Sequence, residues 1–173
     1  MSDAILVTYS TKYGSTEEVS QAVASMLRDG GFSVDVQPMN KVRSLDGYKA
    51  VVLGTALYVG RLHGDSRRFL VAQRAALAKL PVALFALGPV HSEAKEWLGA
   101  REQLAKELAR FPWFTPVAQE VFGGRFDPAK LGFPFNLIPP MRKMPVSDVR
   151  DWTAIRAWAS GLGQLTREPV GVV

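Results

Sequence analysis

The chain has 173 residues, 47% of them hydrophobic, and a mean hydropathy of +0.04, values typical of one globular domain with a substantial core. It contains no cysteine, which excludes disulfides, zinc–thiolate sites, iron–sulfur clusters and cysteine catalysis, so redox chemistry requires a bound organic cofactor. The net charge of +5 and the pI near 9.7 favour anionic partners. There is no long apolar segment, at the N-terminus or elsewhere, so we expect a soluble, cytoplasmic protein.

The N-terminal segment predicts a strand, a loop and a helix in that order. Residues 4–7 form a continuous apolar run, as expected for a strand covered on both faces in a parallel sheet. A run of hydroxyl residues with one glycine follows at 9–16. Val19, Val23 and Leu27 then recur at helical spacing, and Ser15 and Glu18 have the spacing of a capping box.

The loop between this strand and helix predicts a phosphate site, because the first turn of a helix has unpaired N–H donors and a partial positive charge. It lacks the Gly-Lys-[Ser/Thr] of a nucleotide triphosphate loop and the three spaced glycines of a dinucleotide fingerprint. A hydroxyl-rich loop with little cationic charge suits the single terminal phosphate of a mononucleotide such as FMN. The cofactor-binding residues predicted here are Ser10, Thr11, Lys12, Tyr13, Gly14, Ser15 and Thr16.

The next two apolar segments predict an edge strand and a central strand. Residues 32–37 alternate between apolar and polar, whereas residues 50–54 are uniformly apolar and open onto a loop at 55–61. In a doubly wound sheet, ligands bind at the carboxyl ends of the strands where the strand order reverses. We expect Tyr58, in this loop, to cover the isoalloxazine face, and the backbone of Ala56, Leu57 and Gly60 to bond the ring edge.

A helix is expected after Asp65 or Ser66, either of which could cap it, and a fourth strand at Val82–Leu87. The third wall of the flavin crevice is predicted at the end of that strand, from Leu87, Gly88, Pro89 and Val90. His63 and His91 could act as acid–base groups or anion contacts, or could face solvent. The sequence identifies no catalytic residue and no metal site.

A further helix and a strand near residues 115–122 complete the pattern. The chain is therefore predicted to be one α/β domain over residues 1–173, of the flavodoxin-like, doubly wound kind. It should have a five-stranded parallel sheet of order 2-1-3-4-5 with helices on both faces.

Residues 123–146 form an insert that is too long for a tight connection and too apolar for a flexible linker. It is both apolar and basic, which would suit an anionic membrane surface, a large apolar anion or a subunit interface in a homo-oligomer. It could instead pack over the sheet edge as extra core. A final helix is expected from Ser147 or Asp148, with a buried stripe that includes Trp152 and Ile155.

The segment Thr11-Lys12-Tyr13-Gly14-Ser15-Thr16 resembles the FMN-phosphate loop of flavodoxins. The whole layout is similar to the flavodoxin-like, menaquinone-dependent protoporphyrinogen oxidases, through residues 10–16, the Tyr58 loop with Gly60 and His63, the insert, and the Asp151-Trp152 opening of the last helix. The resemblance implies bound FMN, a porphyrinogen as electron donor and a membrane quinone as acceptor. The loop after the fourth strand departs from that family's pattern.

Three alternatives remain open from the residues. The chain could be an electron carrier or flavin-holding protein without a substrate of its own, an NAD(P)H:quinone reductase, or a protein whose crevice holds a deazaflavin or nothing. No nucleic-acid partner is expected, because no recognised motif and no basic run interleaved with aromatics is present. If the insert contacts a membrane, the protein would lie peripherally on the inner face.

Overall fold

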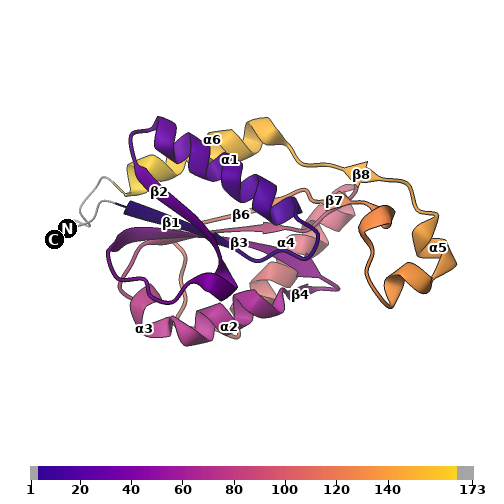
Figure 1. Ribbon diagram of the computed structural model, residues 1–173, viewed down its shortest axis with the longest axis horizontal. Helices are drawn as coiled ribbons and strands as arrows, with labels where there is room; N and C mark the ends of the chain where they lie inside the picture. Colours follow the sequence, from indigo (N-terminus) through magenta and orange to yellow (C-terminus); the bar gives the residue numbers. More distant parts are fainter. Residues whose placement is uncertain (1–3, 167–173) are drawn as a thin grey trace.

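The computed structural model describes residues 4–166, and a twisted parallel sheet forms its centre (Figure 1). The strand order is β2-β1-β3-β5-β6, which confirms the predicted order and the flavodoxin-like fold class. The strands span Ala4–Tyr9 (β1), Ser33–Pro38 (β2), Tyr48–Tyr58 (β3), Val82–Leu87 (β5) and Ala118–Phe122 (β6). A short strand β4 (Arg61–Leu62), which the sequence did not predict, pairs antiparallel with the end of β3.

Helices cover both faces of the sheet, as predicted. Helices α1 (Ser15–Asp29) and α6 (Trp152–Leu165) lie on one face, while α2 (Gly64–Ala72), α3 (Arg74–Leu77) and α4 (Ala94–Leu108) cover the other (Figure 1). Val23 and Ile155 are buried in the core under the first pair, and Phe69 and Leu104 in the core under the second group. The continuous apolar strands β1, β3 and β5 lie between these two cores, whereas the alternating strand β2 lies at the sheet edge.

The capping box predicted for α1 is wrong. The residue that precedes the helix is Gly14, whose carbonyl accepts a hydrogen bond from the Glu18 N–H at 3.1 Å. Ser15 is therefore already the first helical residue, one position too late for its hydroxyl to act as the N-cap. The Glu18 side chain pairs instead with Arg150, at 2.6 Å.

Two other helix starts were also placed wrongly. His63, rather than Asp65 or Ser66, caps α2, because its Nδ1 accepts a hydrogen bond from the Asp65 N–H at 3.1 Å. Helix α6 begins at Trp152, with Asp151 as its cap, and not at Ser147 or Asp148. Those two residues form strand β8 (Ser147–Asp148), whose pairing with β7 (Arg125–Phe126) depends on contacts remote in sequence.

Other boundaries shift by a few residues. The helix expected after residue 65 breaks at Gln73 into α2 and α3, and the last sheet strand starts at Ala118 rather than near 115. The 3₁₀ turn η1 spans Met39–Lys41, and Tyr48 opens β3 opposite Ala4.

The insert lies at the carboxyl end of the sheet rather than over its edge (Figure 1). It contains β7, two 3₁₀ turns (η2, Pro128–Lys130; η3, Phe135–Leu137) and the short helix α5 (Pro139–Arg142), and β8 follows it directly. Its two ends are held together closely, since a Cβ at Gly123 would lie 2.1 Å from the Val149 carbonyl oxygen. The Val149 N–H also donates to the Gly124 carbonyl at 3.1 Å. The insert is thereby fixed above the ends of β1, β3 and β5.

Across residues 4–166, no helix is both long and apolar enough to cross a membrane. The same residues contain no group of three or more histidine, aspartate or glutamate side chains that could hold a metal ion.

Candidate functional site

A cavity of about 300 Å³ opens at the carboxyl ends of β1, β3 and β5. Its lining includes the following residues that the sequence predicted as cofactor-binding: Lys12, Tyr13, Ser15, Ala56, Leu57, Tyr58, Leu87, Gly88 and Val90. The three loops expected to meet there do so, because parallel strands bring their carboxyl ends to one edge of the sheet. The sequence did not predict the rest of the lining: Val59, Gly124, Arg125, Phe126, Leu131, Phe135 and Met141.

Several predicted residues lie beside the cavity rather than on its wall. Ser10 is buried, and its hydroxyl forms hydrogen bonds with the hydroxyls of Ser66 at 2.5 Å and Thr55 at 3.5 Å. This hydroxyl cluster joins the end of β1 to β3 and α2. Gly60 and Pro89 line a neighbouring cavity of about 290 Å³, which shares Leu57, Val59 and Gly88 with the first.

The loop before α1 is folded around Gly14. This residue has a φ of 93°, a conformation that side chains rarely adopt, and its N–H donates to the Thr11 hydroxyl at 2.8 Å. Thr11 therefore shapes the loop, and the following N–H groups of α1 remain as the donors that an anion would use. Thr16 is fully buried, and within the described chain its hydroxyl has no hydrogen-bond partner.

Tyr58 is the last residue of β3 rather than part of a loop. Its hydroxyl accepts a hydrogen bond from the Lys12 N–H at 3.3 Å, and its ring packs edge-on against Tyr13 and His63, with centroid distances of 6.2 and 5.8 Å. Burial is the main cause that raises the pKa of the Tyr58 hydroxyl. Its neutral ring thus forms a fixed wall of the cavity, beside the loop that carries Lys12 and Tyr13.

The turn after Tyr58 is strained. Val59 has a φ of 49°, although its branched side chain disfavours that conformation, and the side chain is 99% exposed. The antiparallel pairing of Tyr58 with Arg61 holds this turn in place at the mouth of the cavity.

Neither histidine lines the cavity. His63 is half-buried as the cap of α2. The Nδ1 of His91 lies 3.1 Å from a Glu96 carboxylate oxygen, and the other oxygen accepts a hydrogen bond from the Val90 N–H at 2.7 Å. Glu96 therefore orders the loop that follows β5.

The insert forms the wall of the cavity that faces the ends of the sheet strands. The sequence analysis did not predict that the insert would line the site. Leu131, Phe135 and Met141 contribute apolar side chains. Lys12 connects the insert to the loop before α1, because its ammonium lies 5.2 Å from the centre of the Tyr13 ring and 5.1 Å from the centre of the Phe135 ring. The unusual apolar content of the insert was a signal of burial, but it gave no indication of where the insert packs.

These residues fit a flavin mononucleotide. The cavity volume lies within the range of about 300–1,000 Å³ common for small-molecule sites, and its walls are largely apolar, as an isoalloxazine ring requires. At the α1 end it meets free N–H donors and hydroxyls, which suit a terminal phosphate. Thr16, in the same turn of α1, does not line the cavity, but its buried hydroxyl has no partner in the described part of the chain, and a phosphate oxygen that reached this turn would supply one.

Comparisons with known proteins agree with this fold. Protoporphyrinogen IX dehydrogenase [quinone] of Escherichia coli K12 is 22% identical over 95% of this chain and 97% of that protein. A point mutant of the flavodoxin from Pseudomonas aeruginosa shares the fold with a TM-score of 0.57 at 19% identity, over 95% of this chain and 99% of that one. Oxidised flavodoxin 1 from Bacillus cereus gives a TM-score of 0.59 at 13% identity, over 96% and 99%.

The model of the flavodoxin domain family matches residues 6–136, which is more than half of the chain and includes each loop at the carboxyl end of the sheet. The chain therefore belongs to the flavodoxin domain family, and its cofactor is FMN.

Proposed function

We propose that this protein is an FMN-dependent oxidoreductase that oxidises a porphyrinogen and passes the electrons to a quinone. The similarity to the E. coli dehydrogenase supports this, because it extends over 95% of the chain, whereas the family match ends at residue 136. At 22% identity the comparison suggests a substrate class, and the geometry of the insert adds to it.

The observation that carries the proposal is the insert's apolar roof over the cofactor cavity. Phe126, Leu131, Phe135 and Met141 face the cavity from the insert, opposite Leu57, Leu87 and Val90 at the ends of the sheet strands. A flat, largely apolar donor such as a porphyrinogen suits walls of this kind. A protein that only carries electrons needs no apolar chamber, because the exposed edge of its flavin is enough for transfer.

Bound FMN supplies an acceptor for two electrons that can be released to a quinone. The protein's own residues would bind and orient it: the N–H groups of α1 would hold the phosphate, Tyr58 would line one side of the ring, and the insert would cover the cavity from the side opposite the sheet. Neither histidine lines the cavity, so we assign no protein general base.

The outer surface of the insert suits an anionic bilayer, where quinones reside. Phe133, Leu137 and Ile138 are exposed on it, at 79%, 64% and 40%, and the exposed side chains of Arg142 and Lys143 lie next in the chain. Apolar side chains that enter the interface, together with cations near anionic headgroups, are the features of a peripheral membrane surface.

Anaerobic mixing of the FMN-loaded protein with protoporphyrinogen and a menaquinone analogue tests the reaction. The proposal expects porphyrin fluorescence to rise only when protein and quinone are both present. If no porphyrin forms while a flavodoxin reductase reduces the flavin rapidly, the protein is an electron carrier. Rapid reduction by NAD(P)H alone would instead identify an NAD(P)H:quinone reductase.

The membrane surface is tested with Arg142→Glu and Lys143→Glu together. We expect the double variant to bind vesicles of anionic lipid more weakly, because each cation near such a surface contributes about 1 kcal/mol. Its affinity for FMN should not change, since neither residue lines the cavity. Equal sedimentation of the variant and the unmodified protein with vesicles would refute the membrane surface.

A further inference from the structure

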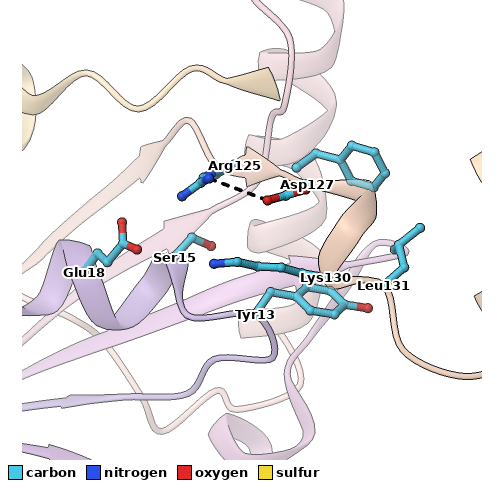
Figure 2. Close-up of a pocket in the computed structure, with 8 residues that line it drawn as sticks. Tyr13, Ser15, Glu18, Arg125, Asp127, Lys130 and Leu131 are labelled. Atoms are coloured by element: carbon cyan, nitrogen blue, oxygen red, sulfur yellow. Dashed lines mark ion pairs between the residues drawn. The ribbon is translucent and has the colours of Figure 1, made fainter. Parts of the chain in front are cut away.

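The first turn of α1 and the insert enclose a small hollow beside the main cavity (Figure 2). It has a volume of about 20 Å³ and shares Tyr13, Ser15, Arg125, Phe126 and Leu131 with the main cavity. Glu18, Asp127 and Lys130 complete its lining. The hollow therefore lies where the phosphate end of a cofactor in the main cavity meets the start of α1.

Most charged groups around this hollow already have partners. Asp127 lies 3.6 Å from Arg125 and also accepts a hydrogen bond from the Ala129 N–H, which caps η2. The Glu18 carboxylate is paired with Arg150, at 2.6 Å. Lys130 differs from them, because it forms no ion pair within the described chain. Figure 2 shows its ammonium extending from η2 toward Ser15.

An ion-pair connection through Arg150 joins the end of the insert to α1. The Arg150 side chain is 4% exposed and bonds Asp148 of β8 at 2.7 Å as well as Glu18 of α1. Its guanidinium also lies 4.9 Å from the centre of the Trp152 ring. Because β8 pairs with β7, this contact holds Arg125 and the η2 turn against the first turn of α1.

We propose that Lys130, with Arg125 beside it, binds the FMN phosphate from the side of the insert. The phosphate is then held between the α1 N–H groups on one side and cations from a distant segment of the chain on the other. The sequence suggested a phosphate loop with little fixed cationic charge. In the structure the insert places two cations, Arg125 and Lys130, on the other side of the same hollow. This inference rests on FMN as the cofactor and not on the substrate proposed above.

The consequence is that the phosphate of bound FMN connects the insert to α1. A ligand with the phosphate contacts both α1 and η2, whereas riboflavin, which lacks the phosphate, contacts only the ring walls. Lys130 should therefore discriminate between the two ligands, while residues elsewhere on the insert should not.

The test is Lys130→Gln, with Lys143→Gln as the matched control, because Lys143 is an exposed insert lysine that lines neither cavity. Quenching of flavin fluorescence measures the Kd for FMN and for riboflavin. We expect Lys130→Gln to weaken FMN binding about three- to tenfold, the effect of one partly exposed charge contact, and to change riboflavin binding less than about twofold. Lys130→Arg should retain FMN affinity, and Lys143→Gln should affect neither ligand.

Two results would overturn the proposal. Equal losses for FMN and riboflavin in Lys130→Gln would show that the side chain acts on the ring or on folding, and unchanged affinity for both would show that it does not reach the phosphate. Failure of the unmodified protein to bind FMN would instead refute the cofactor itself, so the two failures are distinguishable.

Discussion

Thr16 offers a test in which stability and cofactor affinity should change in opposite directions. The residue is fully buried in the first turn of α1, and its hydroxyl has no partner in the described part of the chain. A buried polar group without a partner costs about 1–3 kcal/mol. Valine has a similar shape and a similar helix propensity, so Thr16→Val removes that cost. We expect the free energy of unfolding of the apoprotein to rise by about 1–2 kcal/mol, and the Tm by about 2–8 °C.

The same change should weaken FMN binding, because the hydroxyl is then no longer available to the phosphate. A hydrogen bond to a charged group contributes about 1.5–3 kcal/mol, so the Kd for FMN should rise by a factor of about 10–150. Riboflavin has no phosphate, and its Kd should stay the same. Thermal unfolding of the apoprotein and fluorescence titration with each flavin measure the two effects.

Thr8→Val is the matched control. Thr8 is also fully buried with a hydroxyl that has no partner in the described residues, but it lies within β1, whereas Thr16 lies in the first turn of α1 next to Ser15, which lines the cavity. Thr8→Val should stabilise the apoprotein to a similar extent and leave both flavin affinities unchanged. If Thr16→Val destabilises the apoprotein, the hydroxyl is not an unpaired group in the apoprotein. If the Kd for FMN of the variant equals that of the unmodified protein, the phosphate does not use this hydroxyl.

Two further predictions concern the surroundings of the cavity. Burial lowers the pKa of the His63 imidazole below its ordinary value of 6.5, against the opposing effect of Asp65, while Arg68, Lys12 and Arg67 lower it as well. Stability from this residue is therefore present above pH 6.5 and lost as the pH falls through the folded-state pKa, because protonation also removes the Nδ1 acceptor that caps α2. In His63→Asn, which can still cap the helix, the Tm should fall less between about pH 7 and pH 5 than it does in the unmodified protein. Parallel curves of Tm against pH for the two proteins would contradict this. Val59→Gly should raise the free energy of unfolding by about 1 kcal/mol, since glycine relieves the strained φ and the exposed side chain contributes little packing. Val71→Gly, at an exposed position within α2, should instead lower it by about 0.5–1 kcal/mol, and a loss of stability in both variants would argue against strain at Val59.

The main sheet and its order could be predicted because their signals are local. Continuous apolar runs mark the buried strands β1, β3 and β5, and alternation marks the edge strand β2. Helix starts were less predictable, because several residues near each start can act as the cap. Ser15 and Glu18 matched a capping box, but the backbone placed Gly14 at the cap, and Glu18 pairs with a residue from the far end of the chain.

The sequence by itself determined the fold class, the cofactor and the three loops that meet at the carboxyl end of the sheet, since each depends on residues adjacent in the chain. Only the tertiary structure decided where the insert lies and which of its residues face the cavity. The contacts that place it, Arg150 with Glu18 and Lys12 with Phe135, join segments from opposite ends of the chain. Composition showed that the insert is apolar and basic, but which side chains it buries is set by partners that no local pattern records.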